Sequence, residues 1–330
     1  MNPFSWQTAG SVTEAATHKK NDGSQLLAGG TTQLDLMKCG VFNPETLISV
    51  TQLPGMGSIT FADEIITLGG GVLMSELENH PECQQRAPAL YGSLWQAASP
   101  QIRNMATLAG NLRQRTRCAY YRDPATFPDC NKRTPGSGCA ALAGVTRNHA
   151  ILGGSESCVA TYPGDFAVAL MAFDAVVVLE NAQGAVRKVP IDDFYLLPGN
   201  TPDKEHNLED DELIIAIELP QTAALKNSTY LKVRDRSSYE FAAASAAVGL
   251  VVENGVMVEV RIAVGGVATK PWRARRVEEA LQGQPFSEAL VNQAASRVTE
   301  DAHPLTHNAH KMTLLPRVIA RALIAAGETS

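Results

Sequence analysis

The first part of the chain alternates short apolar runs with helical spacing. Residues 25–28 form an apolar run that stops at Gly29-Gly30, as a buried strand entering a tight turn would. The residues after this turn space their apolar positions as a short helix would, and residues 47–50 form a second apolar run. This order predicts a parallel β-α-β unit over residues 1–55.

The region from about residue 56 to 225 mixes strands and helices around an irregular stretch. Residues 65–68 read as a strand that ends at Gly69-Gly70-Gly71, and residues 89–98 have helical spacing with Pro88 ahead of them. Residues 199–211 form a polar, acidic loop. Further elements are predicted as a helix over 165–173 and strands over 175–179, 185–189 and 213–219.

After residue 226 the pattern changes to three consecutive strands followed by helices. Strands are predicted over 230–233, 242–252 and 256–264, with Glu253-Asn254-Gly255 as a hairpin turn. Helices over 277–281, 287–298 and 313–326 are expected to pack on that sheet. The predicted fold class is therefore α+β, with two N-terminal parts (1–55 and 56–225) and a C-terminal antiparallel sheet (226–330).

Composition narrows the class of protein. With 330 residues, 45% hydrophobic and 19% charged, the chain fits two or three globular domains. The net charge of −6 does not favour nucleic acid or an anionic membrane as a partner, and no apolar run is long enough for a membrane span. The N-terminus lacks the pattern of a secretory signal. We therefore expect a cytoplasmic protein, or a periplasmic one if a partner subunit carries the export signal.

Two glycine-bearing turns are candidate anion sites. One is Ala28-Gly29-Gly30-Thr31 and the other is Thr107-Leu108-Ala109-Gly110-Asn111. Turns without bulky side chains leave backbone N–H groups free to bind phosphate. Neither turn is a Walker A loop or a Gly-x-Gly-x-x-Gly fingerprint. Each on its own is better explained as a simple tight turn, so these residues leave the ligand open.

The two turns together resemble a known family. They are similar to the paired FAD-pyrophosphate motifs of the molybdenum hydroxylase flavoproteins, the FAD-binding subunits or domains of xanthine dehydrogenase, carbon monoxide dehydrogenase and aldehyde oxidoreductases. The likeness covers nearly the whole chain at five ordered places. These are Ala28-Gly29-Gly30-Thr31-Thr32-Gln33-Leu34, the run from Ile102 to Leu112, Pro163-Gly164-Asp165, Asp193-Phe194-Tyr195 through Glu212-Leu213, and Tyr230-Leu231-Lys232-Val233-Arg234.

The resemblance implies a two-subdomain FAD-binding fold and a set of FAD contacts. The turn around Ala28 would wrap the pyrophosphate, and the second turn would hold its other face. Asp165 would bond the ribose or adenosine side, and Lys232 would lie near the flavin ring. Ala109 departs from the family, which usually has glycine there. The implied FAD-binding residues are Leu27, Ala28, Gly29, Gly30, Thr31, Thr32, Gln33, Leu34, Thr107, Gly110, Asn111, Asp165, Leu213, Ile214 and Lys232.

Four of the six cysteines lie in the irregular stretch at about 113–160, which we interpret as an insert. Cys118, Cys130, Cys139 and Cys158 lack Cys-x-x-Cys spacing, so spacing alone leaves structural zinc and ordinary buried thiols open. Six basic residues accompany them and would stabilise thiolates. Cys39 and Cys83 lie outside the insert and are expected to be structural. The basic residues are Arg113, Arg115, Arg117, Arg122, Lys132 and Arg133.

Within the resemblance, such an insert is similar to that of aldehyde oxidoreductase FAD subunits that carry an extra [4Fe–4S] cluster, with the four insert cysteines as its ligands. The implied function is an electron-transfer subunit of a molybdenum-dependent aldehyde or xanthine-type oxidoreductase. Its expected partners are a molybdopterin-binding large subunit, a [2Fe–2S] small subunit and an external electron acceptor. The alternative is a zinc-organised, non-catalytic scaffold on the same fold.

Two further clusters are interpreted as structural. His303, His307 and His310 are spaced for one face of a helix that starts near Pro304, but no His-Glu-x-x-His pattern accompanies them. We read them as a packed or solvated helix face. The acidic run from Glu209 to Glu212 is read as loop solvation.

Overall fold

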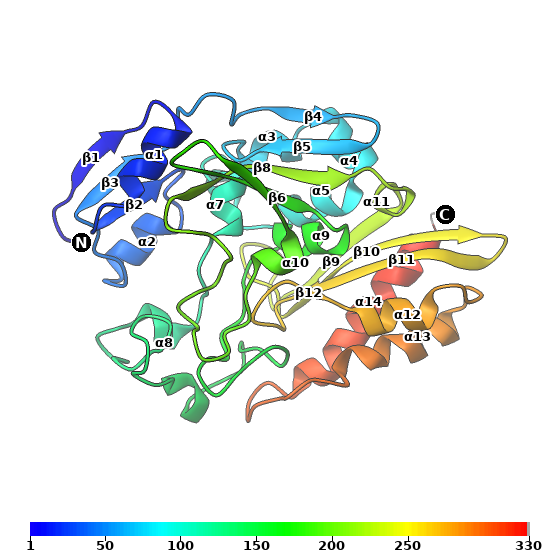
Figure 1. The fold of residues 1–330 in the computed structure, drawn as a ribbon. Helices are drawn as coiled ribbons and strands as arrows, with labels where there is room; N and C mark the ends of the chain where they lie inside the picture. The colour runs from blue at the N-terminus through cyan, green and yellow to red at the C-terminus, as the bar shows by residue number, and fades with distance from the viewer. Residues whose placement is uncertain (329–330) are drawn as a thin grey trace.

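The N-terminal part is a three-stranded parallel sheet in the computed structural model, which describes residues 1–328 (Figure 1). The strand order is β1-β3-β2, and both β1 and β2 pair in parallel with β3. This confirms the predicted β-α-β unit, in which Leu47 and Ile48 are fully buried. Its elements are β1 (Ser5–Thr8), α1 (Val12–Lys19), β2 (Ser24–Leu27), α2 (Gln33–Lys38) and β3 (Thr46–Ser49).

The second sheet has five antiparallel strands in the order β4-β5-β8-β6-β7. Helix α9 carries seven consecutive buried residues because it lies between this sheet's helices and the C-terminal sheet. The strands are β4 (Ile59–Phe61), β5 (Ile65–Gly69), β6 (Val176–Asn181), β7 (Val186–Pro190) and β8 (Glu212–Pro220). The helices are α3 (Met74–Glu78), α4 (Pro81–Arg86), α5 (Pro88–Trp95), α6 (Pro100–Arg103), α7 (Leu108–Leu112), α9 (Phe166–Ala172), α10 (Ile191–Phe194) and α11 (Ala223–Lys226).

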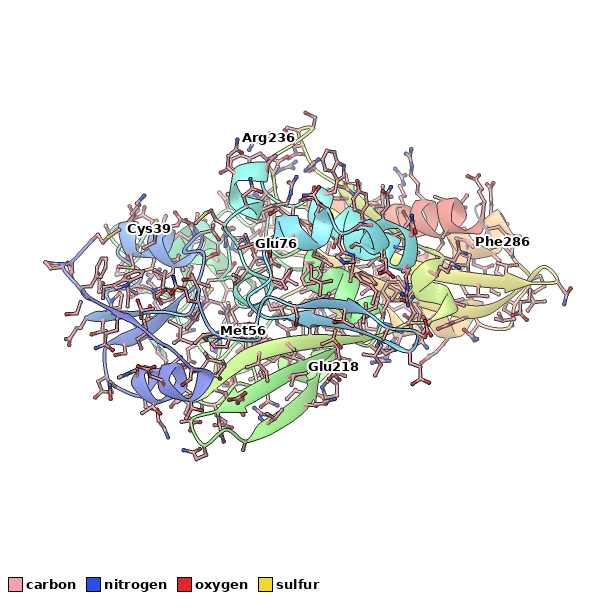
Figure 2. The ribbon with its side chains drawn as sticks, turned by 90° about the horizontal axis from the view of Figure 1, so that it is seen from above. Cys39, Met56, Glu76, Glu218, Arg236 and Phe286 are labelled. Atoms are coloured by element: carbon pink, nitrogen blue, oxygen red, sulfur yellow. The ribbon has the colours of Figure 1, made fainter. Side chains whose placement is uncertain are left out.

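The C-terminal part is an antiparallel sheet in the order β12-β11-β10-β9 with three helices against it (Figure 1). Asn254 and Gly255 both have positive φ, the conformation that a tight hairpin turn needs. Figure 2 shows Arg236 at the tip of the projecting loop between β9 and β10. The elements are β9 (Ser228–Val233), β10 (Ala244–Glu253), β11 (Val256–Gly265), β12 (Trp272–Arg273), α12 (Arg275–Leu281), α13 (Glu288–Ala295), η2 (Ser296–Thr299) and α14 (His310–Gly327).

The cysteine-bearing stretch is irregular, as its turn-forming residues predict. It holds only the short α8 (Ala119–Arg122) and η1 (Ala140–Ala143) and lies below α2 in Figure 1. Cys130 and Cys139 face each other in an isolated antiparallel bridge. Within residues 1–328, no helix combines the length and apolar character needed to cross a membrane.

The histidine helix was predicted wrongly. Helix α14 starts at His310, residues 303–305 are irregular and residues 306–309 form a turn, so the three histidines do not share a helix face. Asn308 explains the difference, because its side chain accepts from Leu305 N at 2.6 Å and donates to the carbonyl oxygens of His149 and Ala150. These bonds stabilise the turn in place of a first helical turn. Glu212 likewise belongs to β8, where its carboxylate pairs with Arg187.

Lys311 on α14 is a buried cation. Its Nζ donates to His149 O at 2.9 Å and to Gly266 O at 2.7 Å, which ties the insert to the C-terminal sheet. Burial, and then Arg147, lower the pKa of Lys311 from 10.5 to about 8. The folded protein therefore releases this proton at a lower pH than the unfolded chain does.

Replacing Lys311 by methionine should change how stability depends on pH. Because the folded pKa lies below the unfolded one, the unfolded chain binds more protons between pH 8 and 10.5, and stability rises with pH there. We expect the unfolding free energy of wild type to rise across this window by up to about 3 kcal/mol more than that of Lys311→Met. Urea titrations across the window, with the exposed Lys226→Met as control, measure the difference; parallel curves for wild type and Lys311→Met would contradict it.

Candidate cofactor site

A cavity of about 320 Å³ opens where the N-terminal sheet meets the ends of β5 and β8. We call it the glycine cavity, because both glycine turns line it. Figure 2 places Met56 at this junction, and Met56 O accepts a hydrogen bond from Gly71 N at 2.8 Å. The lining residues are Lys19, Ser24, Gln25, Leu26, Ala28, Gly29, Gly30, Thr31, Thr32, Gln33, Phe42, Val50, Met56, Gly70, Gly71, Ala106, Thr107, Ala109, Gly110, Arg113, Arg115, Leu213 and Ile214.

The two glycine turns pack directly against each other. A Cβ added to Gly29 would lie 1.7 Å from Met105 O, a distance that no side chain tolerates. Gly30 has φ of +72°, a conformation that L side chains rarely adopt. The first turn therefore needs glycine twice, once for close approach and once for its backbone conformation.

The first turn is the better anion cradle of the two. Among residues 1–328, no hydrogen-bond acceptor faces the amides from Gly29 to Gln33. The second turn uses its amides internally: Leu108 N donates to Val72 O, and Gly110 N donates to Thr107 Oγ1 at 3.1 Å. The second turn thus forms part of the cavity surface, at Gly110. The free N–H groups come from the first turn.

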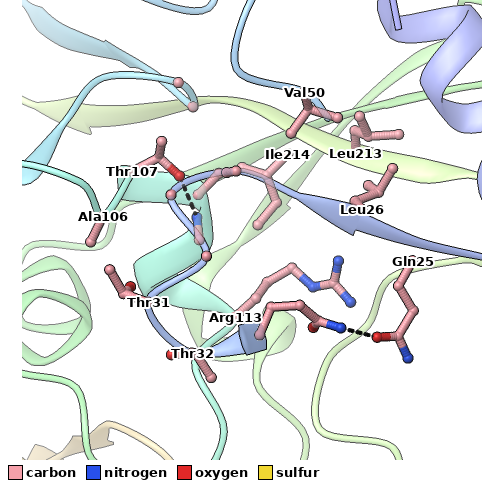
Figure 3. A pocket seen from close by; sticks show the side chains of 18 of the residues that line it. Gln25, Leu26, Thr31, Thr32, Val50, Ala106, Thr107, Arg113, Leu213 and Ile214 are labelled. Carbon is pink, nitrogen blue, oxygen red and sulfur yellow. Dashed lines mark hydrogen bonds between the residues drawn. The ribbon is translucent and has the colours of Figure 1, made fainter. Parts of the chain in front are cut away.

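Three cations stand beside the cavity. Partial desolvation, and then Arg115, lower the pKa of Arg113, whose guanidinium is exposed to the cavity (Figure 3). Burial and the nearby Arg113 lower the pKa of Lys19 to about 8, and Lys19 Nζ donates to Glu209 O and Glu212 O at 3.1 Å. Crowded cations of this kind favour an anionic ligand, which would relieve their mutual repulsion.

The opposite side of the cavity is apolar. Figure 3 shows Leu26, Val50, Leu213 and Ile214 together on one side, facing Thr31, Thr32 and Arg113 on the other. The cavity thus offers a polar, cationic end for phosphate and an apolar wall for a ring system. Leu213 and Ile214 were predicted from the resemblance as pocket residues, and the structure places both in this wall.

Five predicted residues do not line the glycine cavity. Leu27 is buried beneath the turn, the Leu34 side chain packs on Gly30, and Asn111 Nδ2 contacts Met74 Sδ at 3.3 Å. Asp165 and Lys232 lie elsewhere, in contact with each other. Their assignment to FAD stays a prediction.

Asp165 and Lys232 form a buried ion pair between α9 and β9. Lys232 Nζ lies 2.8 Å from Asp165 Oδ2, and Tyr230 Oη donates to Asp165 Oδ1 at 2.7 Å. Burial raises the pKa of Asp165, against the opposing effect of Lys232. Removing one partner of such a pair typically costs about 3–5 kcal/mol because the other charge is left uncompensated.

The four insert cysteines converge on one small pocket, which we call the cysteine pocket. Cys118, Cys130, Cys139 and Cys158 all line it, together with Tyr121 and Lys132 among others. All four are free thiols, and no three metal-ligating side chains among residues 1–328 are already set around a single ion position. Of the other two cysteines, Cys83 is buried in the core and Cys39 is half-buried.

Burial raises the pKa of two thiols of the cysteine pocket, those of Cys118 and Cys158. It raises the pKa of Cys118 to about 12, with amides of Tyr121 and Tyr120 acting the other way and Cys158 and Cys130 adding to the rise. Burial also raises the pKa of Cys158, which Lys132 opposes. The sulfurs are thus close enough to affect each other's protonation, and Cys118 Sγ also lies 3.2 Å from His149 Nε2.

Sequence reasoning missed several residues of the glycine cavity. Gly70 and Gly71 were noticed as a strand end but not assigned, although a Cβ on Gly70 would meet Ile214 O at 2.5 Å. Arg113 and Arg115 were assigned to the cysteines, whereas both line the glycine cavity. The signal that could have identified Gly70 and Gly71 was the glycine triplet after an apolar run, the same pattern that marked the first turn.

Family comparisons agree with this arrangement. Residues 2–222 match the family described as the FAD binding domain in molybdopterin dehydrogenase, and residues 229–326 match the CO dehydrogenase flavoprotein C-terminal domain. The chain belongs to the FAD-binding subunits of the molybdenum hydroxylases. Members of this family are subunits of oxidoreductase complexes, and the observed α+β fold is theirs.

Individual relatives span essentially the whole chain. It is 41% identical over 332 residues to the aldehyde oxidoreductase FAD-binding subunit PaoB of Escherichia coli (strain K12), covering 99% of each chain. It is 24% identical to the glyceraldehyde dehydrogenase medium chain of Sulfolobus acidocaldarius, covering 91% of this chain and 89% of that one. The structure of carbon monoxide dehydrogenase from Hydrogenophaga pseudoflava aligns with a TM-score of 0.76 at 25% identity, covering 99% of each chain.

The glycine cavity fits FAD. Its free amides and cations suit a pyrophosphate, and its apolar wall suits a ring. Ala109, the departure from the family glycine, causes no strain, because it lies in helix α7 and its φ is not positive. When bound, FAD would supply the redox chemistry, and the residues of the glycine cavity would hold it.

Replacing Gly29 by alanine should separate the two turns. The added Cβ collides with Met105 O, so we expect the unfolding free energy to fall by about 1–3 kcal/mol and purified protein to lose FAD. Thermal denaturation and flavin release on gel filtration measure the two effects. Gly57→Ala is the matched control, because nothing lies within 4 Å of a Cβ at that position. Full flavin retention by Gly29→Ala would show that the turns do not hold the cofactor.

Proposed function

We propose that this chain is the FAD- and [4Fe–4S]-containing electron-transfer subunit of a molybdenum-dependent aldehyde oxidoreductase. Its role would be to pass electrons, through FAD, from [2Fe–2S] centres on a small subunit to an external acceptor. Substrate oxidation would take place on a separate molybdopterin-binding large subunit. The observation that carries the proposal is the convergence of four insert cysteines on one pocket next to the FAD-type cavity.

The aldehyde part of the proposal rests on relatives. The PaoB subunit, 41% identical across 99% of both chains, belongs to an aldehyde oxidoreductase by its name, and a second relative belongs to a glyceraldehyde dehydrogenase. A xanthine-type substrate is the variant of the same proposal that other relatives favour. The chain's own residues support only the flavin and metal parts.

The cysteine pocket has the chemistry that a cluster requires. Four thiolates are the ligand set of [4Fe–4S], and the Lys132 side chain beside them supplies positive charge. Because burial raises the pKa of Cys118 to about 12, the free Cys118 thiol holds its proton, and binding iron would release it. Amides that already point at Cys118, from Tyr120 and Tyr121, would stabilise the ligated sulfur.

Structural zinc is the second candidate, because four thiolates suit it equally well. In that case the chain would be a zinc-organised scaffold on the same fold. Metal analysis together with an absorption spectrum of the purified protein separates the two candidates. We expect iron, acid-labile sulfide and visible flavin absorption. Zinc in a colourless protein would support the scaffold, and flavin without iron would remove the cluster.

Replacing Cys130 by serine tests the ligand assignment. Cys130 is buried in the pocket, so its loss should abolish the bound iron and loosen the insert while FAD stays in the glycine cavity. Iron content and flavin content, measured on the same preparation, are the readouts. Cys39→Ser is the control, since Cys39 lies outside the pocket. Unchanged iron content in Cys130→Ser would show that Cys130 is not a ligand.

A further inference from the structure

Arg115 lies between the glycine cavity and the cysteine pocket. The Arg115 guanidinium carbon lies 5.8 Å from the ring centroid of Phe42 and 5.5 Å from that of Tyr121. Phe42 lines the glycine cavity, whereas Tyr121 lines the cysteine pocket. Arg115 therefore contacts the lining of both sites.

Glu205 joins Arg115 to the cysteine pocket. One carboxylate oxygen accepts from Lys132 Nζ at 2.6 Å, and the other forms an ion pair with Arg115 Nε at 2.5 Å. Lys132 lines the cysteine pocket and Arg115 lines the glycine cavity. The exposed fraction of the Lys132 side chain is only 8%, so this pairing is shielded from solvent. The Glu205 carboxylate thus pairs with two cations, one at each of the two sites.

Two hydrogen bonds join the loop that carries Glu205 to the insert, and a third lies within the loop. Leu196 N donates to Glu205 O at 3.0 Å, and Lys132 Nζ also donates to Pro202 O at 3.0 Å. Ser155 Oγ donates to Gly199 O at 2.8 Å. These bonds fix the position of Glu205 relative to both cysteine-bearing loops.

The electrostatics favour an ionised Glu205. Although burial acts to raise the pKa of Glu205, the charges of Lys132 and then Arg115 lower it below its ordinary value. His206 beside it is neutral, because burial lowers the pKa of that imidazole to about 3. The three charged groups Lys132, Glu205 and Arg115 therefore carry a net charge of one positive unit, shared between the two sites.

We propose that Glu205 is a positioning residue common to both cofactor sites, and that it sets the electrostatic potential felt by the flavin and the iron–sulfur centre together. The inference rests on the proposed function, which supplies the two redox groups. Because Arg115 and Lys132 share one carboxylate, a change of charge at Glu205 reaches both sites. A carboxylate elsewhere in the same loop lacks this connection.

The test is a redox titration of the full-length protein carrying Glu205→Gln. Loss of a negative charge adds one net positive charge near both groups and stabilises their reduced forms, so both midpoint potentials should shift to more positive values. Visible absorption follows the flavin, and electron paramagnetic resonance follows the iron–sulfur centre. Asp203→Asn is the matched control, because Asp203 lies in the same loop and no residue of 1–328 pairs with its carboxylate. It should leave both potentials unchanged.

The inference is overturned if only one potential moves, if neither moves, or if Asp203→Asn moves both equally. Should Glu205→Gln fail to fold, Lys132→Gln carries the test with the opposite sign. That change removes a positive charge and leaves Glu205 to Arg115 alone, so both potentials should fall; a fall confined to the iron–sulfur centre would overturn the inference. Wild-type protein that holds zinc, or no flavin, would overturn the proposed function and this inference with it.

Discussion

The close backbone contact between Gly29 and Met105 is the constraint on which the site depends. It joins the N-terminal parallel sheet to the second part of the chain at a point where no side chain fits. The same contact places the free amides of the first turn opposite the apolar residues Leu213 and Ile214 of β8. A cavity with one polar end and one apolar wall follows from this arrangement, and a dinucleotide requires both.

The two glycine turns look alike in sequence but have different roles in the cavity. The second turn begins helix α7, so its Thr107 caps the helix and its amides are consumed within the protein. Only the first turn keeps its amides free. Positive charge for the ligand then comes from Arg113 and Lys19, whose pKa values are lowered first by burial and then by a neighbouring arginine. The site is therefore assembled from one turn, one helix start and cations from two further segments.

The sequence predicted the local elements well because their apolar spacing is regular. The strands from β5 to β11 and the N-terminal β-α-β unit were all expected from apolar runs, several of which end at glycine or proline. The histidine turn could not be predicted, because it depends on Asn308 bonding to His149 and Ala150, about 160 residues away in the chain. Arg113 and Arg115 were linked to the cysteines by sequence proximity, but the fold turns them toward the glycine cavity. Long-range contacts of this kind leave no periodic signal.

The position of the insert in the fold says more about the cysteine pocket than the spacing of the cysteines in the sequence does. An irregular segment of this length needs contacts that stabilise it, and some of these contacts come from outside the segment. Leu36 of α2 packs with Tyr121 and Cys130 in one small apolar cluster. Helix α2 follows directly from the glycine turn that supplies the free amides. The first element after the anion cradle therefore packs against two residues that line the cysteine pocket. Because the helix that follows the flavin-type turn packs against the lining of the cysteine pocket, the charges between the two sites, and Glu205 first among these, would decide whether the sites act separately.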